Sequence, residues 1–127
     1  MPRARSLPLT DLDAARRSHD LSACCSPLGQ APLGAAQAEL VARRLKALAD
    51  PARLRLLSLL MTAPEGEACT CDLTEPLGLA QPTVTHHLKK LADAGLVTGE
   101  RRGTWTHYRV QVDALDDVVQ LLRPGSR

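Results

Sequence analysis

The chain has 127 residues with a formal net charge of +2, and 44% of its residues are hydrophobic and 24% are charged. This length suits one domain with a single core. No run approaches the ~20 apolar residues of a membrane helix, and the N-terminus lacks the continuous apolar stretch of a secretory signal, so we expect a cytoplasmic protein without a membrane partner. The net charge is too small to argue for a nucleic-acid partner, so only the positions of the charges can support one.

Phe and Ile are absent, and aromatic residues make up 2% of the chain. The core must therefore consist of Leu, Val and Ala, which favours packed helices over a β-sandwich. Residues 1–33 contain four prolines, mixed charge and no sustained hydrophobic period. We interpret them as an irregular arm that carries the adjacent pair Cys24 and Cys25. The folded domain is predicted over residues 34–123, followed by a tail of residues 124–127.

Two helices are predicted at the start of the domain. Residues 35–49, AAQAELVARRLKALA, are rich in helix formers. Asp50 then supplies an N-cap and Pro51 a first-turn proline for a second helix over residues 51–62. This second helix is nearly all apolar, so we expect it at the centre of the domain. In the first helix, Val41, Leu45 and Leu48 are expected to lie on one apolar stripe.

A short helix and a longer helix follow the segment EGEACTCDLT. The short helix is predicted over residues 72–77, closed by Gly78, and the longer helix over residues 83–94, closed by Gly95. Between them, residues 79–82 form a tight turn that ends in a proline. The buried face of the longer helix is expected to contain Val84, Leu88 and Leu91.

A β-hairpin and a last helix complete the domain. The hairpin is predicted over LVTGERRGTWTHYRV with Arg102 and Gly103 at its turn. In its second strand, Trp105, His107 and Arg109 should face one side and Thr106, Tyr108 and Val110 the other. Residues 113–122 form the last helix, with apolar Leu115, Val118, Val119 and Leu122. A short helix, a tight turn, a longer helix and a hairpin make a winged helix-turn-helix in a mainly α domain.

The exposed face of the longer helix is expected to read DNA in the major groove. Side chains near the N-terminus of such a helix contact bases, and those further along contact phosphates. We assign base readout to Gln81, Thr83, Thr85 and His86, and phosphate contacts to Lys89 and Lys90. At the hairpin tip, Arg101 and Arg102 are expected to contact the flanking backbone or minor groove. An ordinary solvated helix face would explain the polar residues, but not the preceding turn or the basic hairpin.

His87 is predicted to have a structural role. It lies three residues after Val84, beside the buried stripe, so we interpret it as a partly packed histidine rather than a ligand. A zinc site that joins Cys69 and Cys71 to both His86 and His87 is disfavoured, because adjacent helix residues point ~100° apart.

The four cysteines occur as two pairs. The one-residue spacing of Cys69 and Cys71 places both sulfurs on one side of an extended segment. It also puts Cys71 at the entrance of the short helix, where the helix dipole favours the thiolate. Cys24 and Cys25 can hold one soft ion if the backbone bends. Cytoplasmic thiols are more typical of metal ligands or redox sensors than of structural disulfides, and the residues alone leave those two roles open.

The stretches ALADPARLRLLSLL and ACTCDLTEPLGLAQPTVTHHLKKLADAGLVTGERRGTWTHYRV resemble the ArsR/SmtB family of metal-responsive repressors, over about residues 36–122. The resemblance implies a homodimer formed through the first and last helices, an operator-binding helix from Gln81, and release from DNA when a metal binds. The box Cys69-x-Cys71-Asp72 is similar to the thiolate site of arsenite-responsive members. Cys24 and Cys25 stand where cadmium- and lead-responsive members have arm cysteines, commonly of the other protomer.

The chain departs from the family pattern in two places. Glu75 or its neighbours replace a third box cysteine of some arsenite sensors, so the third thiolate is expected from the arm. The last helix has no histidine, which argues against the C-terminal zinc site of zinc-sensing members. The acidic residues of that helix are Asp113, Asp116 and Asp117.

These observations predict a transcriptional repressor that binds operator DNA, an imperfect inverted repeat, as a homodimer. The predicted inducer is As(III) or Sb(III), bound by thiolates from Cys24, Cys25, Cys69 and Cys71, and the regulated genes confer arsenic resistance. Which box thiolate binds, and whether the arm acts within one protomer or across the dimer, stay open. The alternatives are a Cd(II) or Pb(II) sensor that uses all four thiolates, or a redox regulator that pairs an arm cysteine with a box cysteine. An enzyme is the least supported class, because no catalytic triad, carboxylate pair or phosphate loop is evident.

Overall fold

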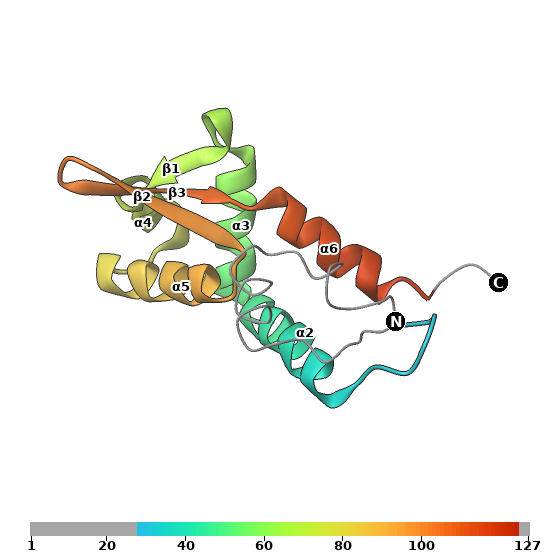
Figure 1. Cartoon of the computed structure of the whole chain (residues 1–127). Helices are drawn as coiled ribbons and strands as arrows, with labels where there is room; N and C mark the ends of the chain where they lie inside the picture. Colours follow the sequence, from blue (N-terminus) through green and yellow to red (C-terminus); the bar gives the residue numbers. More distant parts are fainter. Residues whose placement is uncertain (1–27, 125–127) are drawn as a thin grey trace.

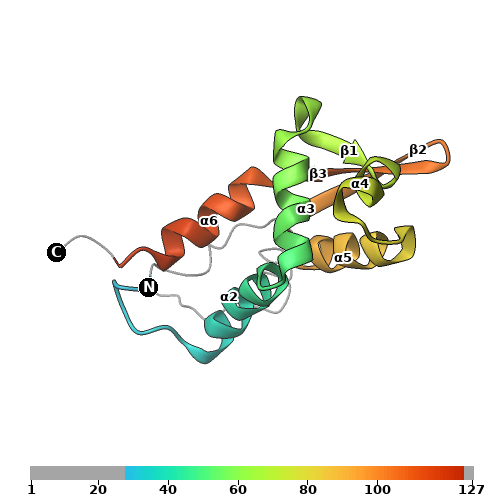
Figure 2. The same cartoon turned by 180° about the vertical axis from the view of Figure 1, so that it is seen from behind.

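The computed structural model describes residues 28–124, so the predicted roles of Cys24 and Cys25 lie outside the described residues. The elements in chain order are α2 (Ala35–Leu48), α3 (Pro51–Thr62), η2 (Pro64–Gly66), β1 (Glu67–Cys69), α4 (Thr70–Leu77), α5 (Gln81–Asp93), β2 (Val97–Arg102), β3 (Trp105–Val110) and α6 (Val112–Leu122). Helix α3 stands at the centre, with the sheet, α4 and α5 on one side and α2 and α6 on the other (Figures 1 and 2). This arrangement confirms the predicted winged helix-turn-helix.

The start of α3 forms as its sequence predicts. Asp50 Oδ2 accepts a hydrogen bond of 3.1 Å from the backbone N–H of Arg53, and Pro51 is the first helical residue. This cap satisfies one of the donors that a helix N-terminus leaves unpaired. The buried residues of α3 are Leu56, Leu57 and Leu60.

The predicted apolar stripe of α2 packs inward. Val41 is buried, and Leu45 and Leu48 are half-buried against the core clusters. The buried face extends beyond this stripe, because the fully buried residues of α2 are Leu40, Val41, Arg44 and Ala47. The reason is that α2 packs in two directions: Leu40 and Val41 cluster with the side chains of α6, whereas Ala47 joins the central core. A helix with two neighbours has a buried face that is broader than one apolar stripe.

The two helices of the helix-turn-helix each begin two residues earlier than predicted. Helix α4 begins at Thr70 and ends at Leu77, and Gly78, with φ of 69°, is the predicted glycine that closes it in the left-handed conformation. Helix α5 begins at Gln81 rather than Thr83, because Pro82 lies inside its first turn instead of in the preceding loop. The predicted buried face of α5 is confirmed, since Val84, Leu88 and Leu91 are fully buried.

The sheet has three strands in the order β1-β3-β2, all antiparallel, and β1 was not predicted. In β3, Tyr108 and Val110 are buried and Arg109 is exposed, as the alternation predicts. The hairpin turn lies one residue later than predicted, because Arg102 still pairs with Trp105. Gly99 lies opposite Tyr108, where a Cβ would come within 2.8 Å of the ring, so glycine allows the tyrosine to lie across β2.

One continuous core holds the DNA-binding half together. It consists of leucine, valine, alanine and one tyrosine, in agreement with the composition, and it draws on α2 to α6 and on the hairpin. Its members are Ala47, Leu56, Leu57, Leu60, Leu73, Leu77, Val84, Leu88, Leu91, Ala94, Leu96, Val97, Tyr108, Val110 and Ala114.

Helix α6 has two apolar faces. One face is buried and packs against α2 and the core through Ala114, Val118 and Leu121. The second face remains exposed in the chain, with 55% of Val112, 55% of Val119 and 44% of Leu122 accessible. These residues follow helical spacing, so they form one stripe. Among the described residues, no helix has both the length and the hydropathy to cross a membrane.

Candidate DNA-reading surface and thiol site

The predicted reading residues lie on the outer side of α5. Five of the six α5 side chains assigned to DNA are exposed, and Thr85 is half-buried at the edge of the buried stripe. The exposed residues are Gln81, Thr83, His86, Lys89 and Lys90. Gln81 and Thr83 lie in the first turn of α5, where a groove-bound helix meets base edges. The two lysines lie later along the helix, at positions suited to phosphates.

His87 ties α5 to the start of α3. Its side chain is 15% exposed, and Nδ1 accepts a hydrogen bond of 3.2 Å from Arg53 Nε. The same nitrogen lies 3.9 Å from Asp50 Oδ2, the cap of α3. The prediction that His87 is partly packed is confirmed, and its contacts hold the reading helix against the adjacent helix junction.

The β2–β3 hairpin, which is the wing of the winged helix-turn-helix, carries two arginines that form ion pairs with Glu67 of β1. Arg102 donates to both carboxylate oxygens of Glu67, at 3.0 and 3.2 Å, and to Glu100 Oε1 at 2.8 Å. Arg109 Nη2 lies 3.5 Å from the same Glu67 carboxylate. The hydrogen bonds from Arg102, with the positive charges of Arg102 and Arg109, lower the pKa of Glu67 despite its partial desolvation. The hydrogen bonds that Arg102 donates to Glu67 and Glu100 in turn raise the pKa of Arg102.

The two arginines of the wing that are predicted to contact DNA therefore differ in their carboxylate partners. Arg102 is held by two carboxylates, whereas Arg101 Nε donates only to the backbone carbonyl of Gly103, at 3.3 Å. A DNA phosphate must compete with Glu67 and Glu100 for Arg102, but it meets no carboxylate partner at Arg101 in the described part of the chain. Arg101 is the more available of the two.

The structure brings Cys69, Cys71 and Asp72 together at the junction of β1 and α4. Their ligand atoms lie within 4.8 Å of one another. Cys69 is buried and ends β1, whereas Cys71 and Asp72 are exposed in the first turn of α4. Only Cys69 lies on an extended strand, because the chain turns into the helix at Thr70, and Cys71 lies at the entrance of the short helix as predicted. The turn nevertheless keeps the two sulfurs adjacent.

Cys69 and Cys71 are joined by a disulfide bond, with their Cα atoms 5.2 Å apart. In this oxidised form neither sulfur is a thiolate. Reduction by two external thiols would produce two adjacent thiols, with the external pair leaving as a disulfide. The reduced pair has the donor set that thiophilic ions prefer. No third cysteine is present within residues 28–124, so a three-thiolate site needs a sulfur from elsewhere.

The thiol box touches both parts of the reading surface. In the β-ladder Cys69 lies opposite His107 of β3, the second strand of the wing. On the other side, Leu73 and Leu77 of α4 share the core with Val84 and Leu88 of α5. A change at the box can therefore reach the wing through one strand pair and α5 through one helix packing.

Known proteins share this architecture. A family model described as bacterial regulatory protein, arsR family, matches residues 50–98. An arsenical resistance operon repressor from Staphylococcus aureus is 44% identical over 78 residues, which are 61% of this chain and 72% of that protein. An uncharacterized HTH-type transcriptional regulator from Methanocaldococcus jannaschii is 38% identical over 84 residues, 66% of this chain and 92% of that one.

The chain belongs to the arsR family of bacterial regulatory proteins. Its fold is also similar to the solution structure of a homodimeric winged helix-turn-helix DNA-binding domain from Mycobacterium bovis, described as a possible ArsR-family regulator. That likeness has a TM-score of 0.60 and 34% identity, and it covers 72% of this chain and 82% of the other.

Sequence reasoning missed two residues beside the arsR-family thiol box. Glu67 holds Arg102, but nothing in the local sequence indicates this pairing, because the two residues are 35 positions apart. His107 lies opposite Cys69, and its Nδ1 is buried without a hydrogen-bond partner in the described part of the chain. Only the unpredicted strand β1 brings either residue to the box.

Proposed function

We propose that this protein is a transcriptional repressor that binds operator DNA as a homodimer and is released when As(III) or Sb(III) binds to its cysteine thiolates. The regulated genes would then be those of arsenic resistance. The observation that carries the proposal is the Cys69-Cys71 pair at the junction of the wing sheet and the helix-turn-helix. The Staphylococcus aureus relative, named as an arsenical resistance operon repressor, supports the choice of ion.

The exposed stripe of α6 supports the proposed homodimer. Val112, Val119 and Leu122 form an unpartnered apolar face on a helix whose opposite face is already buried. A self-complementary contact through this face gives a twofold dimer, in the manner of the homodimeric Mycobacterium bovis domain. Twofold symmetry of the protein matches an operator that is an imperfect inverted repeat.

Operator reading is assigned to the outer face of α5 and to the wing. Gln81, Thr83, Thr85 and His86 would contact base edges, and Lys89 and Lys90 would contact phosphates. Arg101 and Arg102 would contact the flanking backbone or the minor groove. Five of the six α5 side chains are exposed, and Arg101 makes no ion pair with a carboxylate among the described residues; both facts are consistent with these roles.

The inducer site is proposed to combine the box with the arm. As(III) takes three thiolates, and reduction of the Cys69–Cys71 disulfide supplies at most two. Cys24 or Cys25 would supply the third. The same four thiolates would also suit Cd(II) or Pb(II), which is the second candidate inducer.

Release follows if the inducer binds the DNA-free conformation better than the DNA-bound one. A coupling free energy of ~1–3 kcal/mol would weaken operator binding about 5- to 150-fold, and it would weaken inducer binding on DNA by the same factor. The packing of α4 on α5 and the pairing of β1 with β3 are the two contacts through which the box would act.

The disulfide joins Cys69 to Cys71 within the box, whereas the other candidate is a redox-responsive repressor that pairs an arm cysteine with a box cysteine. In that case oxidation alone would release DNA. One experiment separates the candidates: fully reduced, anaerobic protein bound to its own promoter is titrated with As(III), Sb(III), Cd(II) and Pb(II), and separately with diamide. Release by As(III) at the lowest concentration supports the proposal. Release by diamide that dithiothreitol reverses, with no anaerobic response to metal, would replace it with the redox mechanism.

A further inference from the structure

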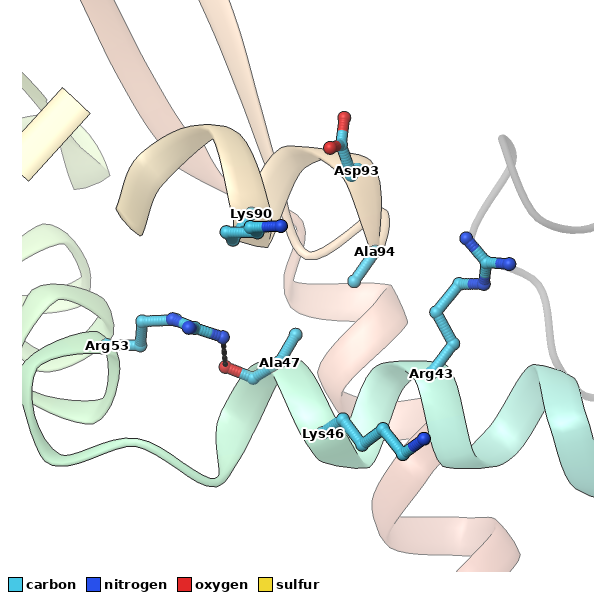
Figure 3. Close-up of a pocket in the computed structure, with 7 residues that line it drawn as sticks. All are labelled: Arg43, Lys46, Ala47, Arg53, Lys90, Asp93 and Ala94. Atoms are coloured by element: carbon cyan, nitrogen blue, oxygen red, sulfur yellow. Dashed lines mark hydrogen bonds between the residues drawn. The ribbon is translucent and has the colours of Figure 1, made fainter. Parts of the chain in front are cut away.

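A basic cavity separates the C-terminal halves of α2 and α5, away from the thiol box (Figure 3). Its volume is about 410 Å³, and its charged lining consists of Arg43, Lys46, Arg53, Lys90 and Asp93. Two alanine residues complete the wall. The cavity therefore gathers four cations and one carboxylate from three different helices.

The cations of this cavity are mostly unpaired. Within the described residues, Arg43, Lys46 and Lys90 make no ion pair. Asp93 projects from α5 away from α2, so its carboxylate does not lie between the cations (Figure 3). Four positive charges around one open space repel one another unless an anion lies among them.

Arg53 is fixed in place at one end of the cavity. Its Nη1 donates to the backbone carbonyl of Ala47 at 3.3 Å, and its Nε donates to His87 Nδ1 at 3.2 Å. Neither contact neutralises the guanidinium. The arginine is therefore a pre-oriented donor group, and a preorganised site costs less conformational entropy when a ligand binds.

The helix dipoles account for only part of this arrangement. Lys46 and Lys90 lie in the last turns of α2 and α5, where cations are favoured. That effect acts on each lysine separately, however, and gives no reason for Arg43 and Arg53 to line the same space. The charges that converge from α2, α3 and α5 are placed so that one anion could contact all three helices.

We propose that this cavity binds a phosphate-type oxyanion and that the bound anion braces the reading helix α5 against α2. Guanidinium and ammonium groups together suit a tetrahedral oxyanion, because arginine supplies paired donors and lysine a point charge. The anion is either a phosphate of the operator backbone or free inorganic phosphate. The proposal involves no metalloid, so its outcome is independent of the inducer assignment.

The first experiment uses inorganic phosphate without DNA. The full-length chain is titrated with sodium phosphate against sodium chloride at matched ionic strength, and backbone amide shifts and thermal unfolding are followed. Phosphate should shift the amides of Arg43, Lys46, Arg53 and Lys90 selectively and raise the unfolding midpoint by at least about 2 °C. The double variant Arg43→Gln/Lys46→Gln should lose both effects, with fold and dimer checked by circular dichroism and sedimentation.

The second experiment measures operator affinity against salt concentration. If the anion is a backbone phosphate, the double variant should flatten the slope of log K against log salt by about 0.9 for each phosphate, or ~1.8 for two cavities in a dimer. Single variants matched in charge provide the control: Lys46→Gln should flatten the slope, whereas Arg123→Gln, beyond the end of α6, should not. Both residues are exposed.

The outcomes separate the sources. Selective phosphate shifts identify free anion as a ligand, and a change of slope alone identifies the operator backbone; either result supports the site. The proposal is overturned if phosphate acts no differently from chloride and if Lys46→Gln and Arg123→Gln give equal slopes.

Discussion

At the scale of single residues, the side chains of α5 differ in exposure. Most of those proposed to read DNA are exposed, whereas His87 is largely buried and contacts Arg53. In the box, Cys69 is buried and Cys71 is exposed. The exposed sulfur is the one that an external thiol or metalloid meets first, so Cys71 should react with alkylating agents faster than Cys69 in the reduced protein.

The arm cysteines can be tested without disturbing the described domain. The double variant Cys24→Ser/Cys25→Ser should bind operator normally, but the As(III) concentration for half-release should rise. We expect this concentration to rise by at least about 10- to 100-fold, because removal of even a group that only supports a metal ligand lowers metal affinity by that factor. DNA anisotropy under metalloid titration measures this. Unchanged release would place the whole inducer site in the box, and single Cys69→Ser and Cys71→Ser variants would then show which sulfur binds.

Base-reading and phosphate-binding residues on α5 should differ in specificity. Lys89→Ala should weaken binding to operator and random DNA alike and flatten the salt slope by about 0.9 per phosphate. Gln81→Ala should weaken the free energy of binding to the operator, but not to random DNA, by ~1–3 kcal/mol, the value for loss of a bidentate base contact. Thr85→Ala should also relax base preference. Affinities for operator and scrambled DNA over a salt series provide the measurement. Equal losses on both DNAs for all three variants would mean that the reading face is misassigned.

At the scale of elements, β1 connects the thiol box to the wing. Only three residues long, it lies at the sheet edge, pairs Cys69 with His107 and places Glu67 beside Arg102. The strand thus joins the two cysteines to a cation that is proposed to contact DNA. A displacement of β1 on inducer binding would change both the backbone pairing of the wing and the availability of Arg102.

The Glu67–Arg102 pair should restrain operator binding. Glu67→Gln removes one carboxylate that competes with DNA phosphates, so operator affinity should increase by about 1.4- to 5-fold, the range expected when a surface ion pair is lost. Glu65→Gln is the matched control, because this exposed residue makes no ion pair in the described part of the chain. Equal effects of the two variants would show that only net charge matters.

At the scale of the whole molecule, the described residues form two functional halves joined by α3. One half contains the box, α5 and the wing, and the other contains α2 and α6 with its exposed apolar stripe (Figures 1 and 2). The basic cavity lies where α2 meets α5, between the proposed dimer contact and the reading helix. Operator binding by a twofold dimer depends on the angle between these halves.

Disruption of the α6 stripe should separate the protomers. Val119→Asp introduces a charge into the exposed apolar face, so the variant should sediment as a monomer. Operator affinity should fall at least about 10²-fold, because two linked half-sites become two independent ones. Gln120→Glu, a charged substitution at the next, exposed position, should retain the dimer and its affinity. A Val119→Asp variant that stays dimeric would place the interface elsewhere.

Local patterns in the sequence determined most of the fold and of the reading surface. The Asp50-Pro51 cap, the left-handed Gly78 and the Val84, Leu88 and Leu91 stripe depend on backbone preferences and side-chain periodicity within a few residues. Because these interactions are local, they can be recognised without knowledge of the fold.

Only the tertiary structure decided how distant segments meet. Strand β1 has three residues and too few alternations to reveal a strand, and it forms because β3 offers an edge for pairing. The broad buried face of α2 depends on its two packing partners. The ion pair between Arg102 and Glu67 joins residues that are 35 positions apart. The basic cavity likewise gathers charges that are dispersed along the chain. Such contacts depend on how elements pack in space, and helical or strand periodicity carries no information about that.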